Sequence, residues 1–137
     1  MVLDTNVALD LLVFLDPNVA LLARALEEGL VEWVACQPMR AELERTLSYP
    51  AIQRRLLSPH EVLIRFDQLV RVTAAPSLPD VGRLRCADTD DQVFIDLALE
   101  QRATWLLSHD SMVRRLAPRA ARLGLWIGPP VGFSLQR

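Results

Sequence analysis

The chain contains no lysine, so all 15 of its basic residues are arginine. This absence excludes sites that need a lysine amine, namely the Walker A phosphate-binding loop and Schiff-base catalysis. The two histidines, His60 and His109, are too few for a histidine-based metal or acid–base site. The Gly-x-Ser-x-Gly, Gly-x-Gly-x-x-Gly and His-Glu-x-x-His motifs are also missing. If the protein is an enzyme, carboxylates must carry its chemistry.

Cysteine and long apolar runs are scarce as well. The cysteines Cys36 and Cys86 lack the spacing of a zinc site, and we expect Cys36 to be a buried free thiol. The longest apolar run near the N-terminus, residues 11–15, lies between Asp10 and Asp16. It is too short to span a bilayer and no basic residue precedes it, so we expect neither a signal peptide nor a membrane helix. The expected location is the cytoplasm.

The length and composition fit one folded domain over residues 1–137. Of the 137 residues, 51% are hydrophobic and 23% charged, and the formal net charge is −2. A chain of this size buries roughly two-thirds of its unfolded surface, which is enough for a core without disulfides.

Short apolar runs alternate with longer helical segments, which predicts an α/β domain with a mainly parallel sheet. Strands are predicted at residues 1–3, 31–36, 105–108 and 124–127. Helices are predicted at residues 7–15, 17–29, 38–48, 59–70, 90–102 and 111–120, the fourth of them opened by the capping box Ser58-Pro59-His60-Glu61. A loop rich in proline and glycine is expected at residues 76–85.

Acidic residues follow the predicted strands at the edge where open α/β sheets bind ligands. Asp4 and Asp110 come at or just beyond the ends of two apolar strands that we expect to be central. Glu42 lies in the first two turns of the helix after the second strand, and Asp91 lies in the first turn of a later helix. We therefore expect these four carboxylates to converge on one cleft.

Each acid also has an ordinary structural explanation. Asp4, Asp91 and Asp110 can cap helices, where the free N–H groups favour a carboxylate, and Glu42 can lie on a solvated helix face. As a set, however, carboxylates without a lysine or histidine to neutralise them repel one another and lose hydration. A hard divalent cation such as Mg²⁺ would offset that cost and could activate water against a phosphodiester.

Four segments, in this order, resemble the motifs of PIN-domain proteins. They are Val2-Leu3-Asp4-Thr5-Asn6-Val7, Met39-Arg40-Ala41-Glu42-Leu43, Asp88-Thr89-Asp90-Asp91-Gln92-Val93-Phe94-Ile95-Asp96-Leu97-Ala98 and Trp105-Leu106-Leu107-Ser108-His109-Asp110. The resemblance covers roughly residues 1–127 and is to the bacterial toxin–antitoxin (VapC-like) branch. It implies a PIN-like three-layer α/β/α sandwich with a central, mainly parallel sheet of four to five strands.

The resemblance further implies an endoribonuclease that depends on Mg²⁺ or Mn²⁺, cleaves RNA and is held in check by a cognate antitoxin. Asp4, Glu42, Asp91 and Asp110 match the metal-binding catalytic acids of the family.

Other polar residues of these motifs match positions beside the acids. Asn6 and Ser108 would orient the acids or a bound water. Asp88 is a further candidate, for a second metal or for a structural role, and Asp90 is expected to cap the helix.

Charge is unevenly distributed along the chain. Residues 77–100 contain two arginines and six acidic residues, whereas residues 102–122 contain five arginines and one aspartate. Arg114 and Arg115, one turn beyond Asp110, either hold an RNA backbone beside the metal or form a solvated helix face. The three tryptophans lie in apolar strands, so no aromatic platform for RNA bases is apparent.

Two other functions stay open. The chain could be a PIN nuclease of RNA processing outside a toxin system, and a short antitoxin gene immediately upstream would argue against that. It could also be a non-catalytic PIN-like module that binds RNA or protein, although the presence of all four acids favours an enzyme. The apolar side chains of residues 11–30 could belong to the core, to the interface of an expected homodimer or to an antitoxin groove.

Overall fold

Five short strands, all paired in parallel, form the centre of the part of the chain that the structure describes. The structure is a computed structural model and describes residues 1–55, 58–80 and 82–135. The strands are β1 (Val2–Leu3), β2 (Trp33–Cys36), β3 (Val70–Thr73), β4 (Trp105–Leu107) and β5 (Trp126–Gly128). This arrangement confirms the predicted α/β class with a parallel sheet.

The strands are hydrogen-bonded in two sets, which the sequence did not predict. One set has the order β1-β4-β5, and the other pairs β2 with β3. Within the described ranges two hydrogen bonds of Met1 join the start of β1 to the β2 stretch: its carbonyl accepts from the Val34 N–H at 2.9 Å, and its ammonium donates to the Glu32 carbonyl at 2.6 Å. β1 has only two residues, so it offers few backbone groups once it has paired with β4.

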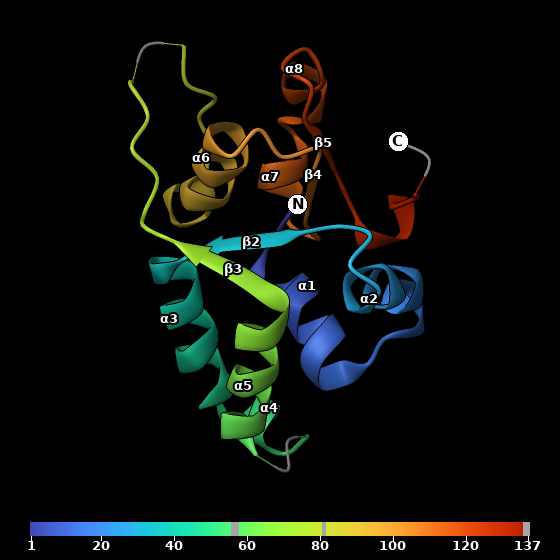
Figure 1. Ribbon diagram of the computed structural model, residues 1–137. Helices are drawn as coiled ribbons and strands as arrows, with labels where there is room; N and C mark the ends of the chain where they lie inside the picture. Colours follow the sequence, from blue (N-terminus) through green and yellow to red (C-terminus); the bar gives the residue numbers. More distant parts are fainter. Residues whose placement is uncertain (56–57, 81, 136–137) are drawn as a thin grey trace.

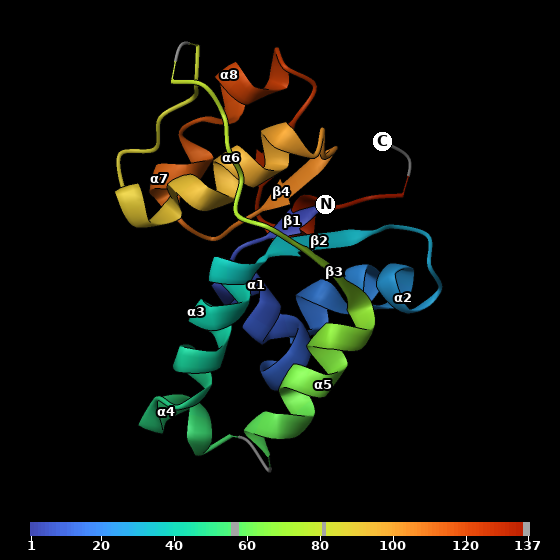
Figure 2. The same cartoon turned by 60° about the vertical axis from the view of Figure 1, so that its left-hand side comes forward.

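Helices cover both sides of the strands, as Figures 1 and 2 show, and complete the predicted three-layer arrangement. One layer contains α1 (Thr5–Leu9), α2 (Ala20–Glu27), α3 (Gln37–Leu47), α4 (Pro50–Gln53) and α5 (Pro59–Leu69). The other layer contains α6 (Gln92–Glu100), α7 (Ser111–Arg114) and α8 (Ala117–Ala121).

The core lies between these layers and is built from aliphatic and aromatic side chains. Trp33 is fully buried and packs edge-to-face on Phe66 with ring centroids 5.2 Å apart. Trp105 contacts Trp126 and Phe133 in the same manner at 5.0 and 5.1 Å. Each large apolar side chain buried in this way contributes about 1.5–3 kcal/mol to the free energy of unfolding.

The structure corrects two predicted helices. The helix predicted at residues 59–70 ends at Leu69, and the next residues form β3 with no turn between them. The helix predicted at residues 111–120 is divided into α7 and α8. Pro118 stands in the first turn of α8, and it has no N–H with which to continue the hydrogen-bond ladder of α7.

The first predicted helix is also irregular. α1 continues into a π-helical segment, Asp10–Phe14, which ends at Leu15 in a left-handed conformation with φ of 50°. Among the described residues no single helix is long and apolar enough to cross a membrane, although the bent pair Thr5–Phe14 and Pro17–Glu27, which meet at 108°, satisfies the length and composition together.

Candidate metal centre

Carboxylates from both layers line one cleft of about 380 Å³. Asp4 directly follows β1, and Asp110 follows β4 by three residues. Glu42 projects from α3, and Asp91 stands immediately before α6. The structure therefore brings the four predicted acids to the same cleft, and Asn6 lines it as well.

Asp4 serves two purposes at once. One carboxylate oxygen accepts a hydrogen bond from the Val7 N–H at 2.9 Å and caps α1, as an ordinary helix start requires. The other oxygen accepts a hydrogen bond from the hydroxyl of Ser108. Burial raises the pKa of Asp4, although these two hydrogen bonds act in the opposite direction.

Ser108 links two of the acids. Its side chain is fully buried, donates to Asp4 and accepts a hydrogen bond from the Asp110 N–H at 3.0 Å. Asp110 in turn caps α7 by accepting from the Met112 N–H at 2.7 Å. The serine hydroxyl thus links the Asp4 carboxylate to the backbone of Asp110, just beyond the paired ends of β1 and β4.

Asp88, Asp91 and Asp110 form the tightest group of acids. Each of them offers one oxygen, and these three oxygens lie within 4.8 Å of one another. Asp88, which the sequence assigned a lesser role, is therefore close enough to share an ion with the other two. Asp88 also caps the short 3-10 helix Thr89–Asp91 by accepting from the Asp90 N–H at 3.0 Å. The expectation that Asp90 caps this helix is therefore wrong.

The group of acids lacks a balancing positive charge among the described residues. The pKa of Asp91 is raised from its ordinary value of 3.8 to about 7, chiefly because the carboxyl is partly buried. The negative charges of Asp110, Asp88 and Asp4 raise it further. In the described ranges, none of these carboxylates forms an ion pair with an arginine or histidine. Positive charge must come from outside the chain if all of them are to ionise.

The donor set fits a hard divalent cation. All three close groups are carboxylates, and oxygen ligands are the ones that Mg²⁺ and Mn²⁺ prefer. Glu42 lies outside the close group, on the cleft wall, where it accepts a hydrogen bond from the Thr5 hydroxyl at 2.7 Å.

Arg114 and Arg115 lie at the end of α7, and both are exposed. Neither of them lines the cleft. Their part in RNA binding stays a prediction.

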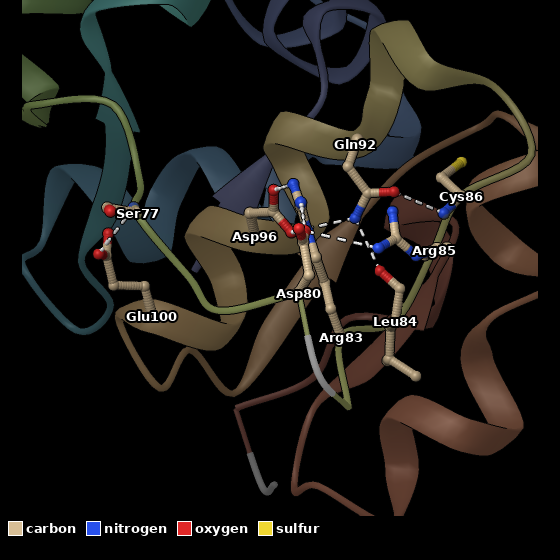
Figure 3. A network of polar contacts seen from close by, with 9 residues as sticks. All are labelled: Ser77, Asp80, Arg83, Leu84, Arg85, Cys86, Gln92, Asp96 and Glu100. Atoms are coloured by element: carbon tan, nitrogen blue, oxygen red, sulfur yellow. Dashed lines mark hydrogen bonds and ion pairs between the residues drawn. The ribbon is translucent and has the colours of Figure 1, made fainter.

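A polar network fixes the loop before the acids onto α6, as Figure 3 shows. The side chain of Gln92 accepts from the Cys86 N–H at 2.7 Å and donates to the Leu84 carbonyl at 2.7 Å and to Asp96 at 3.0 Å. Arg83 also binds Asp96, which is buried, through both carboxylate oxygens. These contacts were not predicted from the sequence. A signal for them was nevertheless present, because Gln92 and Asp96 stand four residues apart on an otherwise apolar helix.

Comparison with known proteins identifies one family. A family model described as PIN domain matches residues 1–112, a range that includes every acid named above. No curated protein and no solved structure matches the chain.

Proposed function

Because the chain belongs to the PIN-domain family, whose members are generally nucleases that depend on a divalent metal ion, we propose that it is an endoribonuclease that uses Mg²⁺ or Mn²⁺. The observation that carries this proposal is the group of carboxylates for which the described part of the chain supplies no ion-pair partner. Carboxylates held this close are costly unless an ion binds between them.

In this proposal Asp88, Asp91 and Asp110 hold the ion, and Asp4 adds negative charge from the neighbouring strand end. The bound ion would supply the charge that ionises water and stabilises the leaving oxygen of a phosphodiester. Ser108 keeps Asp4 and the Asp110 backbone in fixed register through its two hydrogen bonds.

The opposite wall of the cleft supplies polar groups for the substrate. Glu42 is oriented by the Thr5 hydroxyl, which binds only one of its two carboxylate oxygens in the described structure. The other oxygen is available to accept a proton from water in the cleft. Asn6 can donate its amide to a phosphate oxygen or to water.

We propose further that this nuclease is the toxin of a toxin–antitoxin pair, acting as a homodimer in the cytoplasm. The order of its four motifs supports the toxin assignment, because it resembles the VapC-like branch. Exposed leucines support a protein partner: Leu15 and Leu21 are 74% and 47% exposed near the bend between α1 and α2.

Co-expression with a small protein encoded immediately upstream is expected to restore growth that the chain alone inhibits. Growth unaffected by the chain would contradict the toxin role and leave the nuclease proposal standing.

The decisive experiment is cleavage of labelled single-stranded RNA with Mn²⁺ or Mg²⁺, with and without a chelator. We expect cleavage to require the ion and to fall by about 100-fold in Asp91→Asn, which removes one charge from the group. Asp90→Asn is the matched control, because it removes the neighbouring charge, which is exposed and outside the group. Cleavage that survives both the chelator and Asp91→Asn would reject the proposal.

A further inference from the structure

The cleft that contains the acids also has an aromatic side chain at its edge. Tyr49 lines the cleft together with the apolar residues Leu9, Ala51 and Ile52. It is the single tyrosine of the chain, and it is 56% exposed. A large aromatic ring is therefore accessible from solvent within the same cleft as the acids.

The backbone of Tyr49 is held by hydrogen bonds, whereas more than half of the residue is exposed. Its N–H donates to the Thr46 carbonyl at 3.1 Å, and its own carbonyl accepts from the Ile52 and Gln53 N–H groups, both at 2.9 Å. Within the described residues the ring and its hydroxyl make no hydrogen bond and no ring contact. Since a tyrosine has only two side-chain torsions, a ligand that covers this ring would cost little conformational entropy.

The charge around Tyr49 favours a polyanion. Residues 45–55 contain three arginines, Arg45, Arg54 and Arg55, and no acidic residue. All three are exposed, and the Arg55 guanidinium lies over the Phe14 ring at 4.9 Å. None of these arginines lines the cleft itself, but the same segment contributes Thr46, Tyr49, Ala51 and Ile52 to the cleft wall. A strand that leaves the cleft along this segment therefore meets positive charge.

We propose that Tyr49 stacks on an unpaired base of the RNA, next to the linkage that the acidic group hydrolyses, so that the substrate is single-stranded in the cleft. This inference rests on the proposed function. A cleft of about 380 Å³ is large enough for one nucleotide unit. In a duplex both faces of a base are covered by its neighbours, so only an unpaired base can offer a face to the ring.

Binding is tested with a labelled single-stranded oligoribonucleotide and the full chain carrying Asp91→Asn, so that cleavage does not interfere. Adding Tyr49→Ala is expected to raise the Kd about 5- to 150-fold, the range found when a stacking aromatic is removed. Tyr49→Phe keeps the ring and is expected to keep the affinity. Leu123→Ala, an exposed apolar residue that lines a different cavity, is the matched control.

Two further ligands separate stacking from other contacts. An oligonucleotide that lacks the base proposed to stack on Tyr49 is expected to bind with equal affinity to the chains with and without Tyr49→Ala. A fully paired duplex is expected to bind weakly and without dependence on Tyr49. An equal effect of Tyr49→Ala on the Kd for the intact and the abasic strands would overturn the proposal. A Kd that Tyr49→Ala leaves unchanged would also overturn it, and is the result expected if the ring contacts a protein partner instead of RNA.

Failure of this inference and failure of the nuclease proposal give different results. RNA cleavage with a KM unchanged by Tyr49→Ala rejects base stacking and leaves the nuclease intact. Base-dependent binding through Tyr49 without cleavage by the unmodified chain in Mn²⁺ rejects the nuclease and leaves the stacking site.

Discussion

Asp91 is the residue whose charge state is most sensitive to what occupies the cleft. Its pKa of about 7 lies well above the ordinary 3.8, because of burial and the neighbouring acids. The folded, metal-free protein therefore holds this proton more tightly than the unfolded chain does. The contribution of Asp91 to stability is fully present below the unfolded pKa and is lost as the pH rises through the folded one.

The variant Asp91→Asn should consequently be more stable than the metal-free parent, and only at the higher pH. We expect a gain in Tm of a few degrees at about pH 8 that vanishes at about pH 4, measured by thermal unfolding with chelator present. Asp90→Asn, which removes an exposed charge outside the close group, is the matched control. A gain of the same size at both pH values would mean that the effect is not electrostatic.

Ser108 offers a second test on a single side chain. In Ser108→Ala, an oxygen of Asp4 and the Asp110 N–H lose their partner, which is expected to cost about 1–3 kcal/mol in the free energy of unfolding. Metal affinity should fall about 10- to 100-fold, as it does when a group that orients a ligand is removed. Denaturant unfolding and Mn²⁺ titration measure the two effects. Ser108→Thr, which restores a hydroxyl, should recover most of the affinity, and its failure to do so would point to packing instead.

Individual site residues were predictable where a motif and a strand end coincided. Asp4 and Asp110 follow short apolar strands, and their placement needs only the rule that parallel strands end at the same edge. Tyr49 gave no comparable signal, since its access to the cleft depends on how α3 and α4 meet in three dimensions. Asp88 takes the capping role expected of Asp90, because the helical turn begins two residues earlier than the sequence indicates and this start decides which carboxylate reaches the free N–H.

Secondary structure was predictable where turn residues mark its ends. Ser58 caps α5 as its sequence pattern indicates, by accepting from the Glu61 N–H at 3.3 Å. β3 was missed because its residues continue directly from α5, without a glycine or a proline to mark the change. Its conformation is set by pairing with β2, a contact between residues far apart in the chain.

The N-terminal residue of α6 connects the fold to the site. Gln92 binds the loop at residues 84–86, and this loop leads into Asp88. Gln92→Ala should free the loop and lower the affinity for Mn²⁺ about tenfold, although the glutamine is not itself in the close group of acids. Isothermal titration compares this variant with Gln101→Ala, which removes the same side chain just after the other end of α6. Equal affinities in the two variants would show that the loop is held by other contacts.

The molecule as a whole places its acids on both helical layers. Asp4 and Glu42 belong with the layer of α1 and α3, whereas Asp91 and Asp110 belong with α6 and α7. An ion held by Asp88, Asp91 and Asp110 would also attract the carboxylate of Asp4 from the other layer, and so would link the two helical layers through their charges.

Binding of Mn²⁺ should therefore stabilise both layers together. We expect the Tm to rise, the chelator to reverse the rise, and hydrogen exchange to slow at Val7 and at Met112, whose N–H groups are bound to Asp4 and Asp110. Saturation at about 100 times the Kd corresponds to about 2.7 kcal/mol. Exchange that slows in only one of the two layers would show that the ion is not shared.

The division of the acids between the layers coincides with a division of the chain itself. Residues 1–73 contain β1 to β3 with Asp4 and Glu42, and residues 84–112 contain β4 with the other three acids, the two parts being connected by one loop. A protein cut within that loop would become two fragments, one with the three acids of the close group and the other with Asp4 and Glu42. Their reassociation would be driven by burial of the apolar core that both fragments share and strengthened by a divalent ion. Such a pair would work as a split reporter for manganese or magnesium, in which the ion raises the affinity of one fragment for the other.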